Sequence, residues 1–259
     1  MRAIVIKQYG GPEVLQIEER PDPQPKPGHI VIDVKAFGLN HAEIYFRKGL
    51  WGDVAEITGI ECVGTVRSDA DGRFTPGQTV MALVGGLGRS INGSYAEQVC
   101  VPATNVVAVD SDLSREDLAA IPESYATAWT GLMGILGLGK DQIVAIRGAT
   151  SALGQAAVNI AKHIGGARVI ATTRNSSRAA MLDALGVNEV LVESPELANR
   201  VRERHPQGID AVLDIVGNTR CSTRSPRSSA AAMPVSSVSL AVVARCRSNR
   251  YFRSRAPGT

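Results

Sequence analysis

Short alternating runs of hydrophobic and polar residues dominate roughly the first 120 positions of the chain. Each run is bounded by Gly or Pro, as strands usually are. The runs are "RAIVIKQ" at 2–8, "HIVIDVKAFGLN" at 29–40, "GIECVGTV" at 59–66, "QTVMALV" at 78–84 and "YAEQVCV" at 95–101, with a short helical stretch at 41–49. Several short strands joined by Gly-rich turns predict a compact β-barrel-like domain over residues 1–120.

Strands and helices alternate between residues 121 and 217. Apolar runs that suit buried strands are separated by stretches of helical periodicity. The expected strands are 141–148, 167–173, 188–192 and 208–217, and the expected helices between them are 151–165, 176–186 and 194–205. This alternation predicts a doubly wound parallel sheet, so the expected fold class is α/β.

The last expected strand contains "AVLDIV" at 211–216, which is apolar on both faces, as a central strand of a parallel sheet should be. A Rossmann sheet continues beyond this strand, in the order 3-2-1-4-5-6. The sequence contains no recognisable fifth parallel strand. We therefore expect residues 211–216 to form an exposed edge strand, and the Rossmann domain over 121–217 to be incomplete.

Composition changes abruptly at Asn218. Residues 218–259 contain eight Arg, no Lys and no acid; with +3 on the whole chain, residues 1–217 therefore carry −5. We expect this tail to be disordered. Its Arg, Ser, Ala and Pro mixture is typical of GC-rich DNA read out of frame, which indicates a chain truncated or frameshifted after about residue 217.

RNA binding is the functional alternative for the tail. Its arginines would attract phosphate, and Tyr251 and Phe252 could stack on bases. The tail matches no recognised nucleic-acid-binding module, so nucleic acid is not an expected partner.

The first candidate for chemistry is "RGATSALGQAA" at 147–157, between a buried strand and an Ala-rich helix. Small residues let the backbone approach a pyrophosphate, and a helix N-terminus offers N–H groups and a positive dipole end. The candidate phosphate-binding residues are Gly148, Ser151, Ala152, Leu153 and Gly154. An ordinary tight turn is the alternative, because the middle of a full G-x-G-x-x-G pattern is absent.

The end of the second parallel strand, "ATTRNSSR" at 171–178, bears on the choice of cofactor. Proteins that bind NAD usually place an acid here to hold the ribose hydroxyls, and this stretch has none. Guanidinium groups and hydroxyls would instead bind a 2′-phosphate. The pattern predicts NADPH over NADH, held by Thr173, Arg174 and Arg178, with solvated arginines at a helix start as the alternative.

Together these motifs resemble those of the zinc-independent quinone oxidoreductases, the zeta-crystallin-like group of the medium-chain dehydrogenase/reductase superfamily. The resemblance covers residues 1 to about 217. It rests on "GGPEVL", "GLNHAEIYFRKG", "GIECVGTV", "GSYAEQVCVP", "ESYATAWTGL" and "GATSALGQAAVNIAKHIGGARVIATTRN". It implies a GroES-like β-barrel substrate domain and a Rossmann domain, with the nicotinamide held in the cleft between them. Relatives often form homodimers through the far edge of the Rossmann sheet, which this sequence does not supply, so we do not expect that dimer.

The resemblance also implies which residues carry the reaction. Asn40 and Tyr45 would line the substrate cleft and orient a quinone or α,β-unsaturated carbonyl, and Thr127 would lie near the cofactor. An amide and a phenol suit a carbonyl oxygen that gathers charge during hydride transfer. His41 is interpreted as a surface or supporting residue, and a core aromatic is the alternative for Tyr45. The alternative function is an inactive relative that at most binds nucleotide or, through its tail, RNA.

No catalytic metal is expected. Zinc-dependent relatives supply a Cys, which here would fall at 38–40, and a His-Glu pair, which here reads Ile60-Glu61. Glu61 and Cys62 remain, whereas catalytic zinc needs three protein ligands and an open position.

The four cysteines stand at 62, 100, 221 and 246 and form no C-x-x-C pair, which indicates a reducing compartment. The N-terminal run is too short for a signal peptide, and no apolar run approaches the ~20 residues of a membrane span. A cytoplasmic protein without a membrane partner is expected.

Overall fold

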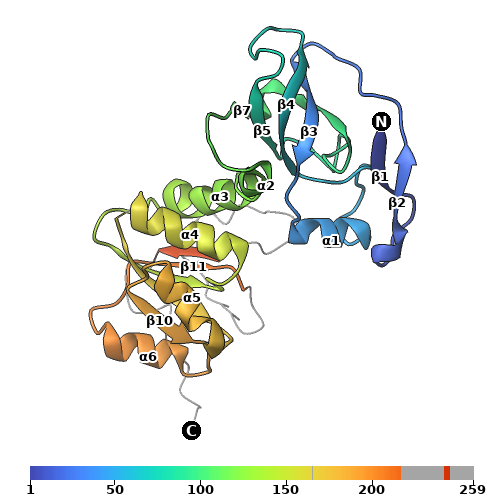
Figure 1. Cartoon of the computed structure of the whole chain (residues 1–259). Coiled ribbons are helices and arrows are strands. Elements are labelled where there is room, and N and C mark those ends of the chain that lie inside the picture. Colours follow the sequence, from blue (N-terminus) through green and yellow to red (C-terminus); the bar gives the residue numbers. More distant parts are fainter. Residues whose placement is uncertain (165, 217–241, 246–259) are drawn as a thin grey trace, which may run out of the picture. The chain divides into compact units, whose positions relative to one another are not determined.

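The computed structural model describes residues 1–164, 166–216 and 242–245, the last of these by backbone alone. The chain forms two compact units, Met1–Glu123 and Ser124–Thr259. Each unit is built around a sheet of its own (Figure 1).

The first unit contains a five-stranded antiparallel sheet in the order β6-β3-β4-β5-β7 and a separate β1-β2 pair. Its strands are β1 (Arg2–Ile6), β2 (Leu15–Glu19), β3 (His29–Ala36), β4 (Glu61–Asp69), β5 (Thr79–Leu83), β6 (Gln98–Pro102) and β7 (Val106–Ala108). Its helices are α1 (His41–Arg47), α2 (Arg115–Ala119) and the single turns η1 (Pro12–Val14) and η2 (Ala103–Asn105). Alternate residues of neighbouring strands, such as Ile30, Ile32, Val80 and Val101, form its main core. The strands expected from alternation are all present.

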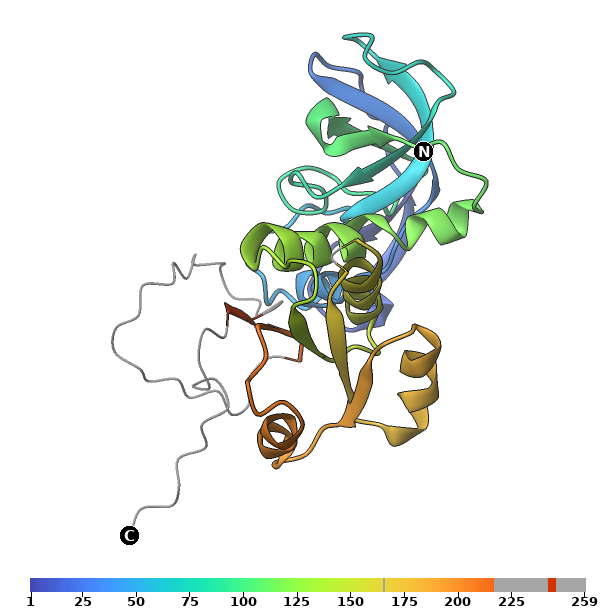
Figure 2. The ribbon, with the colours of Figure 1, turned by 90° about the vertical axis from the view of Figure 1, so that its left-hand side faces the viewer.

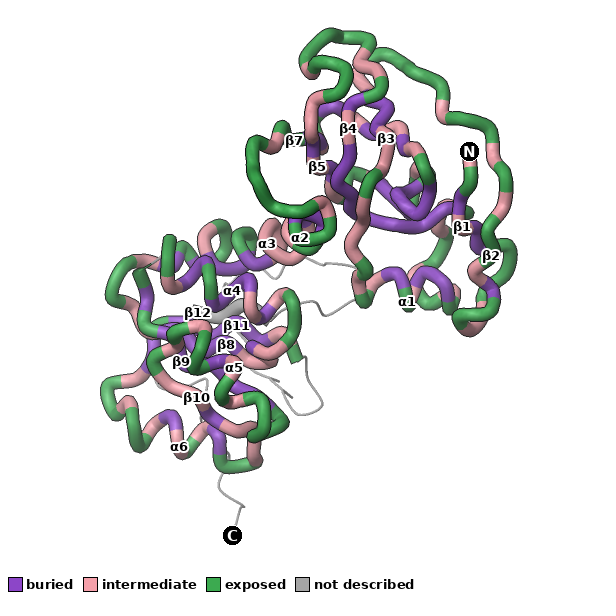
Figure 3. The backbone as a smooth tube through the Cα atoms, in the orientation of Figure 1, coloured by how far each residue is buried: buried purple, intermediate pink, exposed green. Residues whose placement is uncertain are grey.

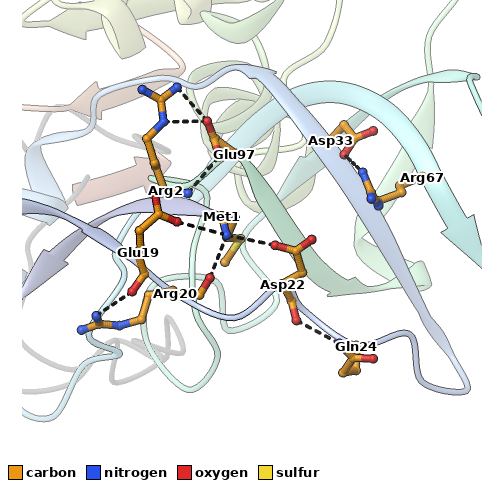
Figure 4. Close-up of polar contacts among 9 residues, drawn as sticks. All are labelled: Met1, Arg2, Glu19, Arg20, Asp22, Gln24, Asp33, Arg67 and Glu97. Atoms are coloured by element: carbon orange, nitrogen blue, oxygen red, sulfur yellow. Dashed lines mark hydrogen bonds and ion pairs between the residues drawn. The ribbon is translucent and has the colours of Figure 1, made fainter.

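Polar contacts hold the N-terminus of this unit in place (Figure 4). The amino group of Met1 donates to the backbone oxygen of Arg20 at 2.8 Å and to Asp22 Oδ1 at 3.0 Å. Arg2 Nε donates to Glu97 Oε1 at 2.8 Å. These contacts connect β1 to the segment after β2 and to the residues before β6.

The second unit contains a mostly parallel sheet in the order β10-β9-β8-β11-β12. Its strands are β8 (Ile143–Arg147), β9 (Arg168–Thr173), β10 (Glu189–Val192), β11 (Ala211–Asp214) and β12 (Val242–Arg245). The helical segments from residue 122 onward are α3 (Pro122–Trp129), η3 (Thr130–Ile135), α4 (Ala152–His163), η4 (Ser176–Arg178), α5 (Ala179–Ala184) and α6 (Leu197–Arg204). The first four strands follow the 3-2-1-4 order expected of a Rossmann sheet.

Both faces of this sheet are covered by helices, as the apolar strands predict (Figures 1 and 2). Val144 and Ile146 of β8 belong to a core cluster with residues of α4 and α5. Ala145, between them, belongs to a second cluster with Leu197 and Val201 of α6. Figure 3 shows β8, β9 and β11 largely buried. A doubly wound arrangement follows from this alternation.

The prediction that residues 211–216 form an edge strand is wrong. β12 pairs with β11 in antiparallel register, Ala211 opposite Arg245 and Asp214 opposite Val242, so β11 has a neighbour on each side. The segment "LAVVA" at 240–244 is apolar and β-branched enough to supply a strand, and the average composition of the tail concealed it. The strand is antiparallel, unlike the fifth strand of a Rossmann sheet.

The predicted disorder of residues 218–259 is wrong at 242–245, which form β12. The rest of the tail, with its two cysteines and the aromatic pair at 251 and 252, lies outside the described ranges, and its frameshifted origin stays a prediction. No helix within the described part of the chain has the length and apolarity needed to cross a membrane.

Candidate active site and nucleotide-binding turn

Asn40 stands immediately before α1 and is held by two glutamates. Its backbone has the extended conformation typical of an N-cap residue, with φ −110° and ψ 149°. Its N–H donates to Glu43 Oε2 at 2.7 Å, and its side-chain Nδ2 donates to Glu61 Oε1 at 2.7 Å. Because a carboxylate can only accept, Nδ2 faces Glu61 and Oδ1 faces away from it.

Glu61 begins β4 and is 3% exposed. Its other oxygen, Oε2, accepts a 2.7 Å hydrogen bond from the backbone N–H of Glu123. Burial raises the pKa of Glu61, and the hydrogen bonds from Glu123 and Asn40 oppose that rise. A Cβ at Gly38 would lie 2.0 Å from Glu61 Oε1, so the absent side chain at position 38 makes room for the carboxylate.

Glu43 lies on α1 and is 5% exposed. Its carboxylate accepts from the Tyr95 hydroxyl at 2.6 Å and from the Ile60 N–H at 3.0 Å, besides the Asn40 N–H. Burial raises the pKa of Glu43 despite these donors, and burial and the charge of Glu43 raise the pKa of Tyr95. Sequence reasoning predicted a site role for neither Glu43 nor Tyr95. The spacing of Glu43, three positions after the N-cap residue Asn40, is typical of a capping box and could have identified Glu43.

Tyr45 lies on α1, five residues after Asn40, and is half-buried. Its ring meets the ring of His41 edge-on, with the centroids 5.7 Å apart. His41 is exposed, as a surface residue should be. Asn40 and Tyr45 therefore come from one short helix and its cap, and their catalytic roles stay predictions.

The residues at the positions where zinc-dependent relatives supply their ligands do not fit a zinc ion. Ile60 is buried, and both oxygens of Glu61 already accept hydrogen bonds. Cys62 is 0% exposed, and burial raises the pKa of its thiol to about 12. The described residues contain no group of three or more His, Cys, Asp or Glu side chains that could hold a metal.

The predicted phosphate turn lies in the second unit, between β8 and α4. Gly148 follows β8 with φ +74°, a conformation that favours glycine. A Cβ at Gly154 would lie 2.4 Å from the Gly148 carbonyl oxygen and 2.6 Å from Ala149 Cα. The first turn of α4 therefore packs directly on the backbone of the loop.

Ser151 is the N-cap of α4. Its Oγ accepts from the Gly154 N–H at 3.0 Å and donates to the Gly148 carbonyl at 2.9 Å. Ser151 and Ala152 are exposed, whereas Leu153 packs against the core. The exposed first turn of a helix presents N–H groups that suit an anion.

The residues predicted to choose the cofactor are the last residue of β9 and residues just after it. Thr173 is buried, and its hydroxyl donates to the carbonyl of Asn175 at 3.0 Å. Arg174 and Arg178 are both exposed. Thr127 is half-buried on α3 in the same unit. The structure thus places the turn after β8 and the end of β9 together, at the carboxyl ends of the parallel strands.

A charged cluster at these strand ends was not predicted from the sequence. Glu193, just after β10, accepts from Arg147 Nη2 at 2.8 Å and from the Thr172 hydroxyl at 2.6 Å. Arg147, the last residue of β8, also donates to Asp214 Oδ2 at 2.6 Å. The cluster joins the ends of all four parallel strands.

Two families match the chain. Residues 26–111 match the alcohol dehydrogenase GroES-like domain, and residues 152–243 match the zinc-binding dehydrogenase family. These matches confirm the predicted α/β fold class, a GroES-like domain with a Rossmann-like parallel sheet.

Among curated proteins, the chain is 29% identical over 219 residues to the mouse protein "Synaptic vesicle membrane protein VAT-1 homolog-like" (Mus musculus). The match covers 83% of this chain and 51% of that protein. The chain spans about half the length of the curated relatives it matches.

Solved structures are also similar. An NAD-dependent alcohol dehydrogenase is 31% identical with a TM-score of 0.75, covering 82% of this chain and 70% of that one. Mycobacterial Rv1454c in complex with NADPH is 30% identical, with a TM-score of 0.75 and coverages of 85% and 68%. A quinone oxidoreductase of Pseudomonas syringae pv. Tomato DC3000 is 30% identical, with a TM-score of 0.75 and coverages of 84% and 67%.

Proposed function

Since the chain belongs to the medium-chain dehydrogenase/reductase superfamily and is quinone-oxidoreductase-like, we propose that it is an NADPH-dependent, zinc-independent oxidoreductase. Its proposed substrate is a quinone or another α,β-unsaturated carbonyl. When bound, NADPH supplies a hydride from C4 of its nicotinamide.

The observation that carries the cofactor half of the proposal is the turn from Gly148 to Gly154. Gly154 approaches the Gly148 carbonyl so closely that a Cβ at position 154 would collide with it, so only glycine fits here. The residues present fit a pyrophosphate: the N–H groups of Ala152 and Leu153 in the first turn of α4 would hold it, while Gly148, Ser151 and Gly154 shape the turn, since the Ser151 hydroxyl donates to Gly148 and accepts from Gly154.

The choice of NADPH rests on the residues after β9. Arg174 and Arg178 are exposed and cationic, and they would bind a 2′-phosphate through charge-assisted hydrogen bonds. Thr173, with its hydroxyl already donated to Asn175, would contribute its backbone. Thr127 is assigned to the cofactor by resemblance alone.

In the substrate half, Asn40 and Tyr45 would orient the carbonyl oxygen that gains charge. Asn40 would donate from the N–H of Nδ2 that does not face Glu61, and Tyr45 would donate from its phenol. Fixed donors aimed at a developing oxyanion are an effective form of catalysis. Zinc independence is supported by the donor set, in which Ile60 replaces an imidazole and Glu61 is already bonded on both oxygens.

The test is steady-state oxidation of NADPH, with p-benzoquinone and cyclohexenone as acceptors, for the full chain. Turnover that depends on NADPH, is reduced in Asn40→Ala and survives a chelator supports the proposal. A folded chain that binds NADPH without oxidising it supports the alternative of an inactive nucleotide-binding relative. Loss of turnover on chelation overturns zinc independence.

The proposal also includes a cellular location and partners. The free thiols of Cys62 and Cys100 support a reducing compartment such as the cytoplasm. The proposed partners are the cofactor and the small-molecule acceptor.

A further inference from the structure

A carboxylate lies beside Arg174, although none follows it closely in the sequence. β9 and β10 pair in parallel with Val192 opposite Thr173, and the Glu193 N–H donates to the Thr173 carbonyl at 2.8 Å. Residues 174 and 193 are therefore the next positions on two paired strands. Glu193 brings to the end of β9 the kind of group that dinucleotide sites use to choose their ribose.

This carboxylate is held in place by three hydrogen bonds from two residues. Glu193 Oε1 accepts from the Thr172 hydroxyl at 2.6 Å and from Arg147 Nε at 3.0 Å, and Oε2 accepts from Arg147 Nη2 at 2.8 Å. The last two form the parallel pair typical of a guanidinium on a carboxylate. The Glu193 side chain is 14% exposed, so its position is well defined.

The same contacts reach the phosphate turn. The Gly148 N–H donates to Thr172 Oγ1 at 3.3 Å, and Arg147 is the residue before Gly148. The pKa of Glu193 is lowered: burial raises it, but the hydrogen bonds from Arg147 and Thr172 and the charges of Arg147 and Arg174 outweigh burial. Glu193 is therefore ionised at neutral pH, within the field of Arg174.

We propose that Glu193 is a second determinant of the preference between NADPH and NADH, and that Arg147 limits its effect by neutralising its charge. This inference rests on the proposed cofactor site. A carboxylate beside Arg174 repels a 2′-phosphate, whereas both oxygens of Glu193 already accept from Arg147 or Thr172 and are less available to a ribose hydroxyl. Arg147, which is bonded to both Glu193 and Asp214, offsets that repulsion because its positive charge lies against the Glu193 carboxylate.

The experiment measures dissociation constants of NADPH, NADH and 2′,5′-ADP by calorimetry, for the full chain at low salt. In Glu193→Gln we expect NADPH and 2′,5′-ADP to bind about threefold to tenfold more tightly, with NADH changed less than twofold, because only the first two carry the 2′-phosphate. In Arg147→Gln we expect the opposite change. In Arg147→Gln with Glu193→Gln the preference should return toward that of the natural chain.

Glu189→Gln is the matched control. Glu189 begins the same strand at its other end, four residues or ~13 Å from Glu193, so its charge lies much farther from a 2′-phosphate at the end of β9. If Glu193→Gln shifts the preference no more than Glu189→Gln does, the inference is overturned.

The outcomes separate this inference from the proposed function. If the natural chain binds NADPH, Arg174→Ala weakens that binding and Glu193→Gln leaves it unchanged, the inference alone fails. If the natural chain binds neither dinucleotide, both fail. Thermal unfolding of each variant checks folding, and the Glu193→Gln result stands alone if Arg147→Gln unfolds.

Discussion

Asn40 Nδ2 donates a 2.7 Å hydrogen bond to Oε1 of Glu61, a carboxylate that is 3% exposed. The other oxygen of Glu61 accepts from the Glu123 N–H, so each oxygen has a donor. The amide of Asn40 therefore has one orientation. A donor with one orientation is preorganised for a developing oxyanion, which is the role proposed for Asn40.

We expect Glu61→Gln to lower kcat for a quinone about tenfold to a hundredfold with little change in KM. The oxygen of the new amide at position 61 would accept from the Glu123 N–H, and its NH₂ group would face Asn40. The Asn40 amide would then flip, because its oxygen can accept from that NH₂ group and its own NH₂ group cannot. Adding Asn40→Asp places a carboxylate at position 40 that accepts from this new amide, so the double variant should regain thermal stability but not activity. Steady-state kinetics and thermal unfolding check both halves. Unchanged kcat in folded Glu61→Gln would mean that Glu61 only packs, and activity in the double variant would mean that the Asn40 N–H is dispensable.

Gly154→Ala should destabilise the second unit by about 1–3 kcal/mol and weaken NADPH binding at least tenfold. The added Cβ would lie 2.4 Å from the Gly148 carbonyl, so the first turn of α4 must move away from the loop. Gly134→Ala is the control, because the nearest atom to its Cβ is 4.0 Å away. Chemical denaturation and calorimetry measure the two effects. Equal behaviour of the two variants would show that the close approach does not matter.

Arg174→Ala should raise the dissociation constant of NADPH about tenfold and that of NADH less than twofold, because a guanidinium bonds the 2′-phosphate that NADH lacks. Arg168→Ala removes an exposed arginine from the other end of the same strand and should change neither. Calorimetry gives both constants. An equal loss for NADPH and NADH would contradict the assignment of Arg174 to the 2′-phosphate.

Tyr95→Phe should lower the free energy of unfolding by about 1–2 kcal/mol at neutral pH and by less in acid. The Tyr95 hydroxyl donates to Glu43 and opposes the rise that burial causes in the Glu43 pKa from its ordinary value of 4.5. That donor favours ionised Glu43, so its contribution is present above the Glu43 pKa and is lost as pH falls through it. Denaturation at pH 4 to 8 measures the difference between the variant and the natural chain. A deficit that is equal at every pH would show that Tyr95 acts by packing alone.

Local pattern was enough to predict most elements. The run "HIVIDVKA", bounded by Gly28 and Gly38, predicts a strand, and β3 is one; the apolar run in "DQIVAIRG" predicts a buried strand, and β8 is one. The turn at Gly148 was also predictable, because its small residues, strand and helix are consecutive. The pairing of β12 with β11 was not, because the five apolar residues at 240–244, in an Arg- and Ser-rich stretch, favour a strand only when a partner edge is present.

The sequence by itself determined the α/β fold class, the order of strands and helices, the glycine turn and the positions of Asn40, Tyr45 and Arg174. These depend on interactions between residues close together in the chain, and hydrophobic periodicity records them. The tertiary structure alone decided that Glu61 orients Asn40, that Tyr95 bonds Glu43 and that Glu193 stands beside Arg174. The members of these pairs are 21, 52 and 19 residues apart. Such pairs meet because packing buries polar groups, and a buried carboxylate is stable only where the fold supplies a donor for it.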